Sequence, residues 1–291
     1  MSRPLLVALG CLLPLACQPV ADPSHWPEQH LDVASGDGSA PPVALTAELT
    51  GTWALATDWS TCVTIGKPFE NRTRKLLRVE MSQQGHRVHE LRRVCSIQTT
   101  PLLGLVTVIP DPVIAAIGPL HVESLLFWNG PGQSFLGGVD AQLFGAKLDD
   151  PISDALPGKS DLSDPRIVDS DGDGEPGATL LVGAACKIHV VQRAISTLDG
   201  VVQTSGRIAG QGMHATQQVV LSATSPICST TFTTAPNDSQ NQFTLMRVDA
   251  GGLNLDSDGN GDVSCAEIIA AQGQLIAWRE PDNAHCEASP R

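Results

Sequence analysis

Tyrosine is absent from this sequence, and charged side chains are scarce. Among 291 residues there are 18 Lys and Arg against 31 Asp and Glu, which gives a formal net charge of −13. Nucleic-acid binding needs clustered cationic side chains at the phosphates, so we expect no nucleic-acid partner. Charged residues make up only 17% of the chain, whereas Gly and Pro contribute 27 and 21 residues. This composition favours a turn-rich, mainly β fold over a helical bundle.

The chain also lacks an unbroken apolar run long enough for a membrane helix, which needs about 20 consecutive apolar residues. Its most apolar long segment, residues 102–128, is interrupted by Pro110, Pro112 and Pro119. We therefore predict buried strands and turns in this segment. The lining of an apolar cavity is the alternative.

The first 16 residues have the features of an export signal. Arg3 supplies a positive charge, and residues 4–15 are almost wholly apolar. We predict a signal peptide at residues 1–16. The run that closes it, Leu13-Pro14-Leu15-Ala16-Cys17, resembles the lipobox of bacterial lipoproteins, with Pro14 where Leu is usual.

The lipobox resemblance implies that Cys17 is diacylated, becomes the mature N-terminus and anchors the protein to a membrane. Because Gln18 is not Asp, it also implies the outer rather than the inner membrane of the cell envelope. The alternative is cleavage after Ala21 and a secreted product. Residues 17–46 contain five Pro and no periodic apolar pattern, so we predict a disordered tether.

Six cysteines lie beyond the predicted tether, with no Cys-x-x-Cys pair among them. An even number at long spacing predicts three disulfides in an oxidising compartment, with buried free thiols as the alternative. Six cysteines allow about fifteen pairings, and loop closure favours neighbours along the chain. The expected pairs are Cys62 with Cys95, Cys186 with Cys228, and Cys265 with Cys286.

Residues 47–250 contain short segments of alternating polarity separated by turn residues. Segments 76–81 and 88–97 flank a Gln-Gln-Gly turn and predict a β-hairpin. Short, evenly spaced strands favour an antiparallel β-barrel or β-sandwich. A diverged duplication into halves 47–160 and 161–250 stays open. Later predicted strands are 179–182, 187–192, 201–208, 217–221 and 243–248.

The opening of this β domain, Gly51-Thr52-Trp53, is similar to the Gly-x-Trp start of lipocalin-type barrels. That resemblance implies a carrier of a small apolar ligand, with residues 102–128 as the lining of its cavity.

Residues 256–267 have oxygen-bearing side chains at the spacing of an EF-hand calcium loop. A hard cation needs six to eight oxygens around one point, and Gly261 at position 6 allows the sharp turn that brings them together. We therefore predict a Ca²⁺ site. Its ligands are Asp256, Asp258 and Asn260 at positions 1, 3 and 5, Asp262 at position 7 through its carbonyl, and Glu267 at position 12.

The structural alternative is a polar turn in which Ser264 and Glu267 form the capping box of a following helix. The two interpretations are compatible, since position 9 of such a loop starts a helix. Residues 268–276 show a helical apolar stripe that we expect to pack on the β domain. No entering helix precedes the loop, so residues 251–291 resemble a dockerin-like loop-plus-helix unit, which implies a fixed structural ion.

A second, weaker candidate is the segment 169–177, where oxygens again fall at positions 1, 3 and 5. Position 12 is Leu180, so the shell would need another ligand such as Asp161 or Asp164. The alternative is a plain turn before a strand. The candidate ligands are Asp169, Asp171, Asp173 and Glu175.

No catalytic motif is complete in this sequence. Gly158-Lys159-Ser160 lacks the earlier Gly of a phosphate-binding loop, and Gly132–Gly137 is one residue too long for a nucleophile elbow. We therefore assign no enzyme activity. The sequence favours a lipid-anchored, disulfide-bonded, calcium-binding surface protein whose partner is an unidentified protein, glycan or small apolar ligand.

Overall fold

The computed structural model describes residues 48–129, 132–225, 228 and 232–287. The predicted signal peptide 1–16, the lipidation site Cys17 and the tether 17–46 lie outside the described residues. In the described part, no helix has the length and apolar character needed to cross a membrane.

The described residues are organised mainly as strands, with a few short helices. The helices are α1 (Asp111–Ala116), η3 (Asp238–Gln240), α2 (Cys265–Ala270), α3 (Gln272–Leu275) and α4 (Ala284–Glu287). The strands are β1 (Gly51–Ile65), β2 (Lys67–Gln84), β3 (Arg87–Thr99), β4 (Thr107–Val108), β5 (Leu120–Asn129), β6 (Gly132–Phe144), β7 (Ala178–Val182), β8 (Cys186–Thr204), β9 (Arg207–Ala223), β10 (Thr233–Pro236) and β11 (Gln242–Arg247).

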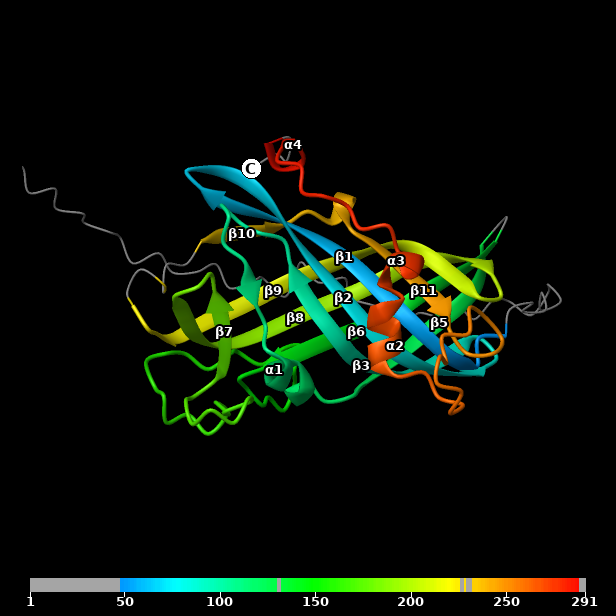
Figure 1. Ribbon diagram of the computed structural model, residues 1–291, viewed down its shortest axis with the longest axis horizontal. Helices are drawn as coiled ribbons and strands as arrows, with labels where there is room; N and C mark the ends of the chain where they lie inside the picture. The colour runs from blue at the N-terminus through cyan, green and yellow to red at the C-terminus, as the bar shows by residue number, and fades with distance from the viewer. Residues whose placement is uncertain (1–47, 130–131, 226–227, 229–231, 288–291) are drawn as a thin grey trace, which may run out of the picture.

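Eight strands form a closed antiparallel ring in the order β1-β2-β3-β5-β6-β8-β9-β11, and β11 pairs back onto β1 (Figure 1). The prediction of a mainly β chain folded as an antiparallel barrel or sandwich is confirmed, and ring closure makes it a barrel. β6 pairs with β8 across residue 160, so strands from both sides of that residue belong to one sheet.

The predicted hairpin is confirmed, because β2 and β3 pair from Gln84–Arg87 along most of their length. Its turn contains Gly85 at φ +62°, a left-handed conformation that glycine adopts without strain. The predicted strand 201–208 is wrong as a single element. It contains the end of β8, a turn at Ser205-Gly206 and the start of β9.

The ring is hydrogen-bonded differently at its two ends. At the end we call the closed end, β11 pairs with β1 at Trp53–Asp58 and with β9 at Arg207–Gly210. At the other end, the open end, β1 pairs at Thr61–Thr64 with β10. Among the described residues β10 pairs with β1 alone, so no hydrogen-bonded strand joins β1 to β9 at the open end.

Apolar side chains fill the barrel interior at the closed end, because alternate residues of each strand point inward. Trp53, Leu55, Leu77, Phe135 and Leu245 are each at most 1% exposed and belong to one cluster. The inward-facing alternation of these strands therefore supplies the main core.

The apolar segment 102–128 contains β4, helix α1 and most of β5, so the prediction of strands and turns missed the helix. Val113 and Ile114 of α1, and Ile117 directly after it, pack against Phe144 and Val190 in a second apolar cluster. Pro at the start of α1 suits the first helical turn, where its missing N–H is not needed. The segment thus covers one side of the open end.

The C-terminal segment, residues 251–287, packs on the outer face of the barrel, and α2 and α3 lie across β1 and β2 in Figure 1. Ile268 and Leu275 are buried against Ala54 and Leu76, which confirms the predicted apolar stripe. The stripe is divided between two short helices that meet at Ala271 rather than running through one.

All six cysteines beyond the predicted tether form disulfides, as predicted, but only the Cys186–Cys228 pairing is confirmed. The predictions Cys62–Cys95 and Cys265–Cys286 are wrong. Cys62 bonds Cys286, and Cys95 bonds Cys265. Loop-closure entropy favours short loops, but the C-terminal segment returns to the outer faces of β1 and β3 and brings distant cysteines together.

Candidate functional site

The predicted calcium loop 256–267 begins where the chain leaves the barrel wall. Leu255 N donates to Val248 O at 2.8 Å, which fixes the start of the loop just beyond β11. Val263, in the loop, is 3% exposed and packs with Ile268 on the outside of the barrel. The loop is thus attached to the barrel at its start, next to Leu255, and again at Val263.

Three of the predicted ligands converge. Asp256, Asp258 and Glu267 each offer a carboxylate oxygen, and these oxygens all lie within 4.8 Å of one another. Asn260 adjoins this set, because its Nδ2 donates to Asp258 Oδ2 at 3.0 Å. Asp262 turns its carboxylate away to Arg78 Nη2 at 2.5 Å, which leaves its carbonyl as the group predicted to bind.

Backbone N–H groups hold the loop carboxylates in place. Asp256 accepts from Asn260 N at 3.1 Å and from Gly261 N at 2.8 Å through its two oxygens. Gly259 and Gly261 have φ of +70° and +86°. The positive φ predicted for Gly261 is therefore confirmed, and it lets the chain turn inside the carboxylates.

Glu267 links the loop to helix α2. The Ser264–Glu267 capping box is present, with Ser264 N donating to Glu267 Oε2 at 2.8 Å. Ser257 N donates to the other oxygen, Oε1, at 2.6 Å. Hydrogen bonds from Ser264 and then Ser257 lower the pKa of Glu267 to about 2, so this carboxylate is ionised at neutral pH.

Arg78 and a disulfide attach the loop to the barrel. Arg78 Nε donates to Val263 O at 2.6 Å, beside its ion pair with Asp262. Burial alone would lower the pKa of Arg78, but hydrogen bonds to Glu80 and Asp262 outweigh it and raise the pKa. Cys265, the first residue of α2, bonds Cys95 of β3. A change that orders the loop would therefore also restrain strands β2 and β3 of the barrel wall.

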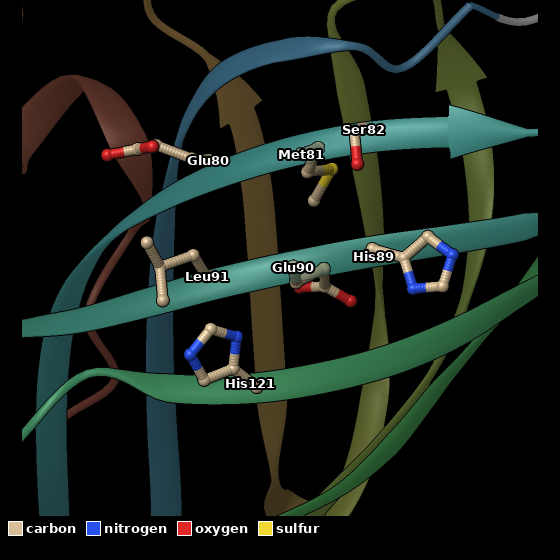
Figure 2. Close-up of a pocket in the computed structure, with 7 residues that line it drawn as sticks. All are labelled: Glu80, Met81, Ser82, His89, Glu90, Leu91 and His121. Carbon is tan, nitrogen blue, oxygen red and sulfur yellow. The ribbon is translucent and has the colours of Figure 1, made fainter.

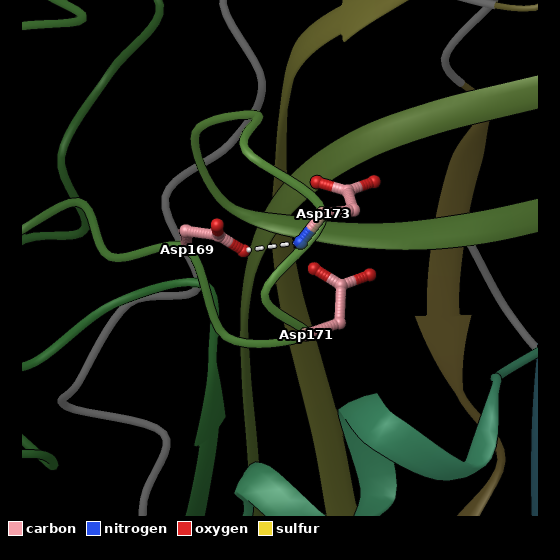
Figure 3. Close-up of side chains that lie close together, drawn as sticks. All are labelled: Asp169, Asp171 and Asp173. Atoms are coloured by element: carbon pink, nitrogen blue, oxygen red, sulfur yellow. Dashed lines mark hydrogen bonds between the residues drawn. The ribbon is translucent and has the colours of Figure 1, made fainter.

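The second candidate loop also gathers three carboxylates, Asp169, Asp171 and Asp173, within 4.8 Å of one another. Figure 3 shows the three side chains around the loop, with Asp169 accepting from the backbone of Asp173. Hydrogen bonds, first from Gly174 N, lower the pKa of Asp169. Glu175 stands outside this carboxylate set among the described residues.

Two nearby residues could complete the ligand shell of the second loop. Each of them already makes a contact that would have to break before it could reach the loop. Asp164 forms an ion pair with Arg166 at 2.7 Å, and Asp161 accepts from Ser163 Oγ at 2.6 Å. The strand predicted after the loop is β7, whose Thr179 N donates to Asp171 Oδ2 at 3.1 Å. The second site therefore has the poorer ligand set.

A shallow surface pocket of about 320 Å³ lies over β2, β3 and β5 (Figure 2). His89 and His121 lie on it, and His89 Nδ1 is 3.7 Å from Glu123. In the described part of the chain these histidines belong to no group of three metal-ligating side chains within reach of one ion.

A layer of polar side chains, not predicted from the sequence, crosses the barrel interior above the closed-end core. Arg92 Nε donates to Glu90 at 2.9 Å and its Nη1 to Asp140 at 3.0 Å, while Lys75 Nζ donates to Gln142 at 2.9 Å. The signal was present in the inward positions of the predicted hairpin, where Glu90 and Arg92 replace apolar residues. We call this set the polar layer: Thr57, Lys75, Glu90, Arg92, Ser124, Asp140, Gln142, Ser196 and His214.

Burial changes the protonation of two members of the polar layer. It lowers the pKa of Lys75 to about 8, against the opposing effect of the Asp140 charge. It also lowers the pKa of His214 well below the usual value, and the charge of Lys75 adds to this. His214 is therefore neutral at physiological pH, and its ring stacks on Trp59 with centroids 5.3 Å apart.

Comparison of this chain with models of protein families, with curated proteins and with solved structures finds no match.

Proposed function

We propose that this protein is an exported, disulfide-bonded surface protein whose barrel is stabilised by Ca²⁺ bound at residues 256–267. The observation that carries the proposal is the convergence of Asp256, Asp258 and Glu267 within 4.8 Å at the start of a helix packed on the barrel. Oxygen ligands of this kind suit Ca²⁺, which accepts irregular shells of six to eight oxygens.

The position of the loop supports a structural role for the ion. Glu267 would bind the ion and also caps α2, while the next buried residue, Ile268, packs on the barrel. A bound ion would therefore stabilise the docked C-terminal segment by mass action on the folded state.

The disulfides and the N-terminal pattern support export. Three disulfides persist in an oxidising compartment and are rare in the cytosol. Together with the lipobox-like run at Cys17, the disulfides support our proposal that the protein is an outer-membrane lipoprotein that displays its barrel on a tether. The second loop, with Asp169, Asp171 and Asp173, is proposed as a weaker Ca²⁺ site.

The barrel interior favours this proposal over a carrier of a small apolar ligand. Side chains of the main core, including Trp53, Phe135 and Phe243, occupy the interior at the closed end. Above them lies the polar layer, and beyond it α1 packs on Phe144 and Val190.

The test is thermal unfolding of the oxidised protein with Ca²⁺ and with a chelator, for wild type, Glu267→Gln and Asp171→Asn. We expect the chelator to lower the melting temperature of wild type and Asp171→Asn, and to have little effect on Glu267→Gln. Glu280→Gln, the same change at an exposed Glu of the C-terminal segment, is the control and should keep the wild-type sensitivity. A chelator effect that is absent from wild type would refute the proposal.

A further inference from the structure

Exposed apolar side chains of the described residues gather at one place on the open end. Leu103, Leu105, Val106 and Val108 are 59%, 54%, 41% and 47% exposed. All four lie in residues 102–108, which form a turn and strand β4 after β3 has ended. The other exposed large apolar residues of the described part are scattered singly. Contiguous exposed apolar surface of this kind is a sign of an interaction site.

A second turn lies against the first. Strand β4 pairs with β7, and Gly183 N, in the turn between β7 and β8, donates to Val106 O at 2.9 Å. The turn residues 183–185 are exposed. We call residues 102–108 and 182–186 together the apolar tip. It contains no charged residue, although the whole chain has a formal net charge of −13.

Hydrogen bonds and a disulfide hold the backbone of the apolar tip. Leu102 N donates to Leu105 O and Leu105 N to Leu102 O, both at 2.9 Å, which closes a two-residue turn. Cys186, at the start of β8, bonds Cys228 beyond the end of β9. Backbone groups that are already paired within the protein can leave water without the penalty of an unsatisfied donor or acceptor. These groups can therefore enter an apolar medium with their bonds intact.

Leu103 adopts a backbone conformation that is uncommon for a large side chain. Its φ is +52°, and that of Gly104 is +81°. Asn-Gly is a favoured pair in two-residue hairpin turns, because both positions need positive φ. Leu at the first position is strained there and, at 59% exposure, gains little packing within the barrel. Strain of this kind persists at functional sites, which points to a contact made outside the barrel.

The side chains of the apolar tip suit lipid better than protein. Protein interfaces are enriched in Tyr, Trp and Arg, which combine large area with hydrogen bonding, and Leu and Val are under-represented among their strongest contacts. The apolar tip offers mainly Leu, Val, Ala and Gly. Acyl chains form no hydrogen bonds, so they match side chains that need none.

The nearest acidic loop is set back from the apolar tip. Asp171 of that loop accepts from Thr179 N, near the start of β7, whereas the turn follows Val182 at the end of the strand. Three residues of a strand span about 10 Å. The loop carboxylates would thus stay outside the acyl region when the turn residues enter it.

We propose that the apolar tip inserts into a phospholipid bilayer and holds the open end of the barrel against it. Leu103 and Leu105 would enter the boundary between headgroups and acyl chains, where interfacial segments reach a depth of about 5–10 Å. Lys187, exposed directly after the tip, would lie at the level of the phosphates. The contact needs neither Ca²⁺ nor acylation of Cys17. An anchor there would permit it, since the residues from Cys17 to Leu49 span on the order of 100 Å when extended.

The experiment measures quenching of tryptophan fluorescence by phosphatidylcholine vesicles with brominated acyl chains. The protein is exported and oxidised with an unrelated cleavable signal in place of residues 1–17, so that neither the predicted signal nor an acyl group contributes. Leu105→Trp places the probe on the apolar tip. Val201→Trp is the control, at a 47% exposed position near the closed end of β8.

We expect the vesicles to quench Leu105→Trp more strongly than the unsubstituted protein and to leave Val201→Trp at the unsubstituted level. Such a difference would locate the tip within the bilayer. Absence of added quenching at position 105, or equal added quenching at position 201, would overturn the proposal.

Sedimentation with phosphatidylcholine vesicles then compares affinities. Leu103→Asn/Leu105→Gln should bind at least about tenfold more weakly, because two apolar side chains lose their contact with lipid. Asn tolerates the positive φ of position 103. The matched control, Leu162→Gln/Val201→Gln, removes two apolar side chains of 48% and 47% exposure outside the tip and should keep the unsubstituted affinity.

Binding should persist when NaCl is raised from about 0.1 to 0.5 M, because salt screens charges and not apolar contacts. Near-ultraviolet circular dichroism checks that each variant is folded. Equal affinities of the two folded double variants, or loss of binding at high salt, would overturn the proposal. Self-association that the tip variant abolishes, in place of vesicle binding, would assign the tip to a second copy of the chain and would also overturn it.

Discussion

Arg72 lies at the centre of a buried cluster of charged side chains on the outer face of the barrel wall. Its Nε contacts Asp58 at 2.9 Å and its Nη1 contacts Glu70 at 2.5 Å, with all three side chains at 0% exposure. The C-terminal segment covers this cluster, and Asp282 N donates to Glu70 Oε2 at 2.6 Å. Removing one member of such a buried pair leaves an uncompensated charge.

We therefore expect Arg72→Ala to destabilise the protein by about 3–5 kcal/mol, because Asp58 and Glu70 would stay buried without their partner. Denaturant unfolding of the oxidised protein measures this. The control is Arg87→Ala on β3, whose ion pair with Glu123 is exposed on both sides, 55% for Arg87 and 37% for Glu123. That change should cost about 1 kcal/mol or less. Equal losses of unfolding free energy in the two variants would contradict the assignment of Arg72 to a buried charged cluster.

Glu70 also gives the cluster a pH dependence. Burial would raise its pKa, but hydrogen bonds from Ser60, Asp282 and His285 together with Arg72 outweigh burial and lower it below 4.5. A lowered folded pKa means that the unfolded chain binds the proton first as pH falls. The stabilisation is therefore present above the ordinary pKa and is lost as pH falls through the folded pKa.

We expect the melting temperature in chelator to fall below about pH 4.5, and Glu70→Gln to flatten part of that fall. Chelator removes any contribution of calcium binding. Glu280→Gln, a substitution at a Glu whose side chain is 84% exposed, tests for a general charge effect. Identical acid profiles for wild type and Glu70→Gln would show that this carboxyl does not carry the dependence.

At the scale of elements, two disulfides attach the C-terminal segment to strands that precede it by most of the chain. Cys62–Cys286 and Cys95–Cys265 have sequence separations of 224 and 170, against 42 for Cys186–Cys228. In the chain-entropy account, a crosslink that closes a longer loop restricts the unfolded chain more.

We expect the double variant Cys95→Ala/Cys265→Ala to lose about 1 kcal/mol more stability than Cys186→Ala/Cys228→Ala. Chemical denaturation without reductant compares them, and Cys62→Ala/Cys286→Ala should resemble the first. The Cys95/Cys265 variant should also need more Ca²⁺ for half-maximal stabilisation, because Cys265 starts the helix that Glu267 caps. A larger loss for the Cys186/Cys228 variant would argue against the entropic ranking.

At the scale of the whole molecule, the calcium loop packs on the outer face of the barrel against β1 and β2, and the open end lies where β1 pairs with β10. Attachment to the cell envelope stays a prediction from the sequence, because Cys17 lies outside the described residues. The lipobox-like run predicts that attachment through Cys17.

We expect full-length protein produced in a diderm bacterium to incorporate radiolabelled palmitate and to fractionate with the outer membrane. Cys17→Ala should abolish labelling, because no thiol is then present at the acylation position. Cys11→Ala, in the apolar part of the same signal, is the control and should keep the label. Labelling that survives Cys17→Ala would show that this cysteine is not the acylated residue.

Local chemistry made several features predictable from the sequence. The order of oxygen side chains from Asp256 to Glu267, the positive φ of Gly261 and the Ser264 cap all depend on residues within one loop. The β2–β3 hairpin likewise needs only alternation and a glycine turn. These features follow from short-range backbone geometry, so the sequence by itself determined them.

Only the tertiary structure decided which distant groups meet. The partners of Cys62 and Cys95, the cover over Arg72 and the polar layer across the barrel all join strands or segments far apart in the chain. Loop-closure entropy disfavours such contacts one at a time, and they form because ring closure and burial of the C-terminal segment stabilise them together. The balance of charge between Lys75, Arg92, Glu90 and Asp140 is visible only once the ring brings their strands face to face.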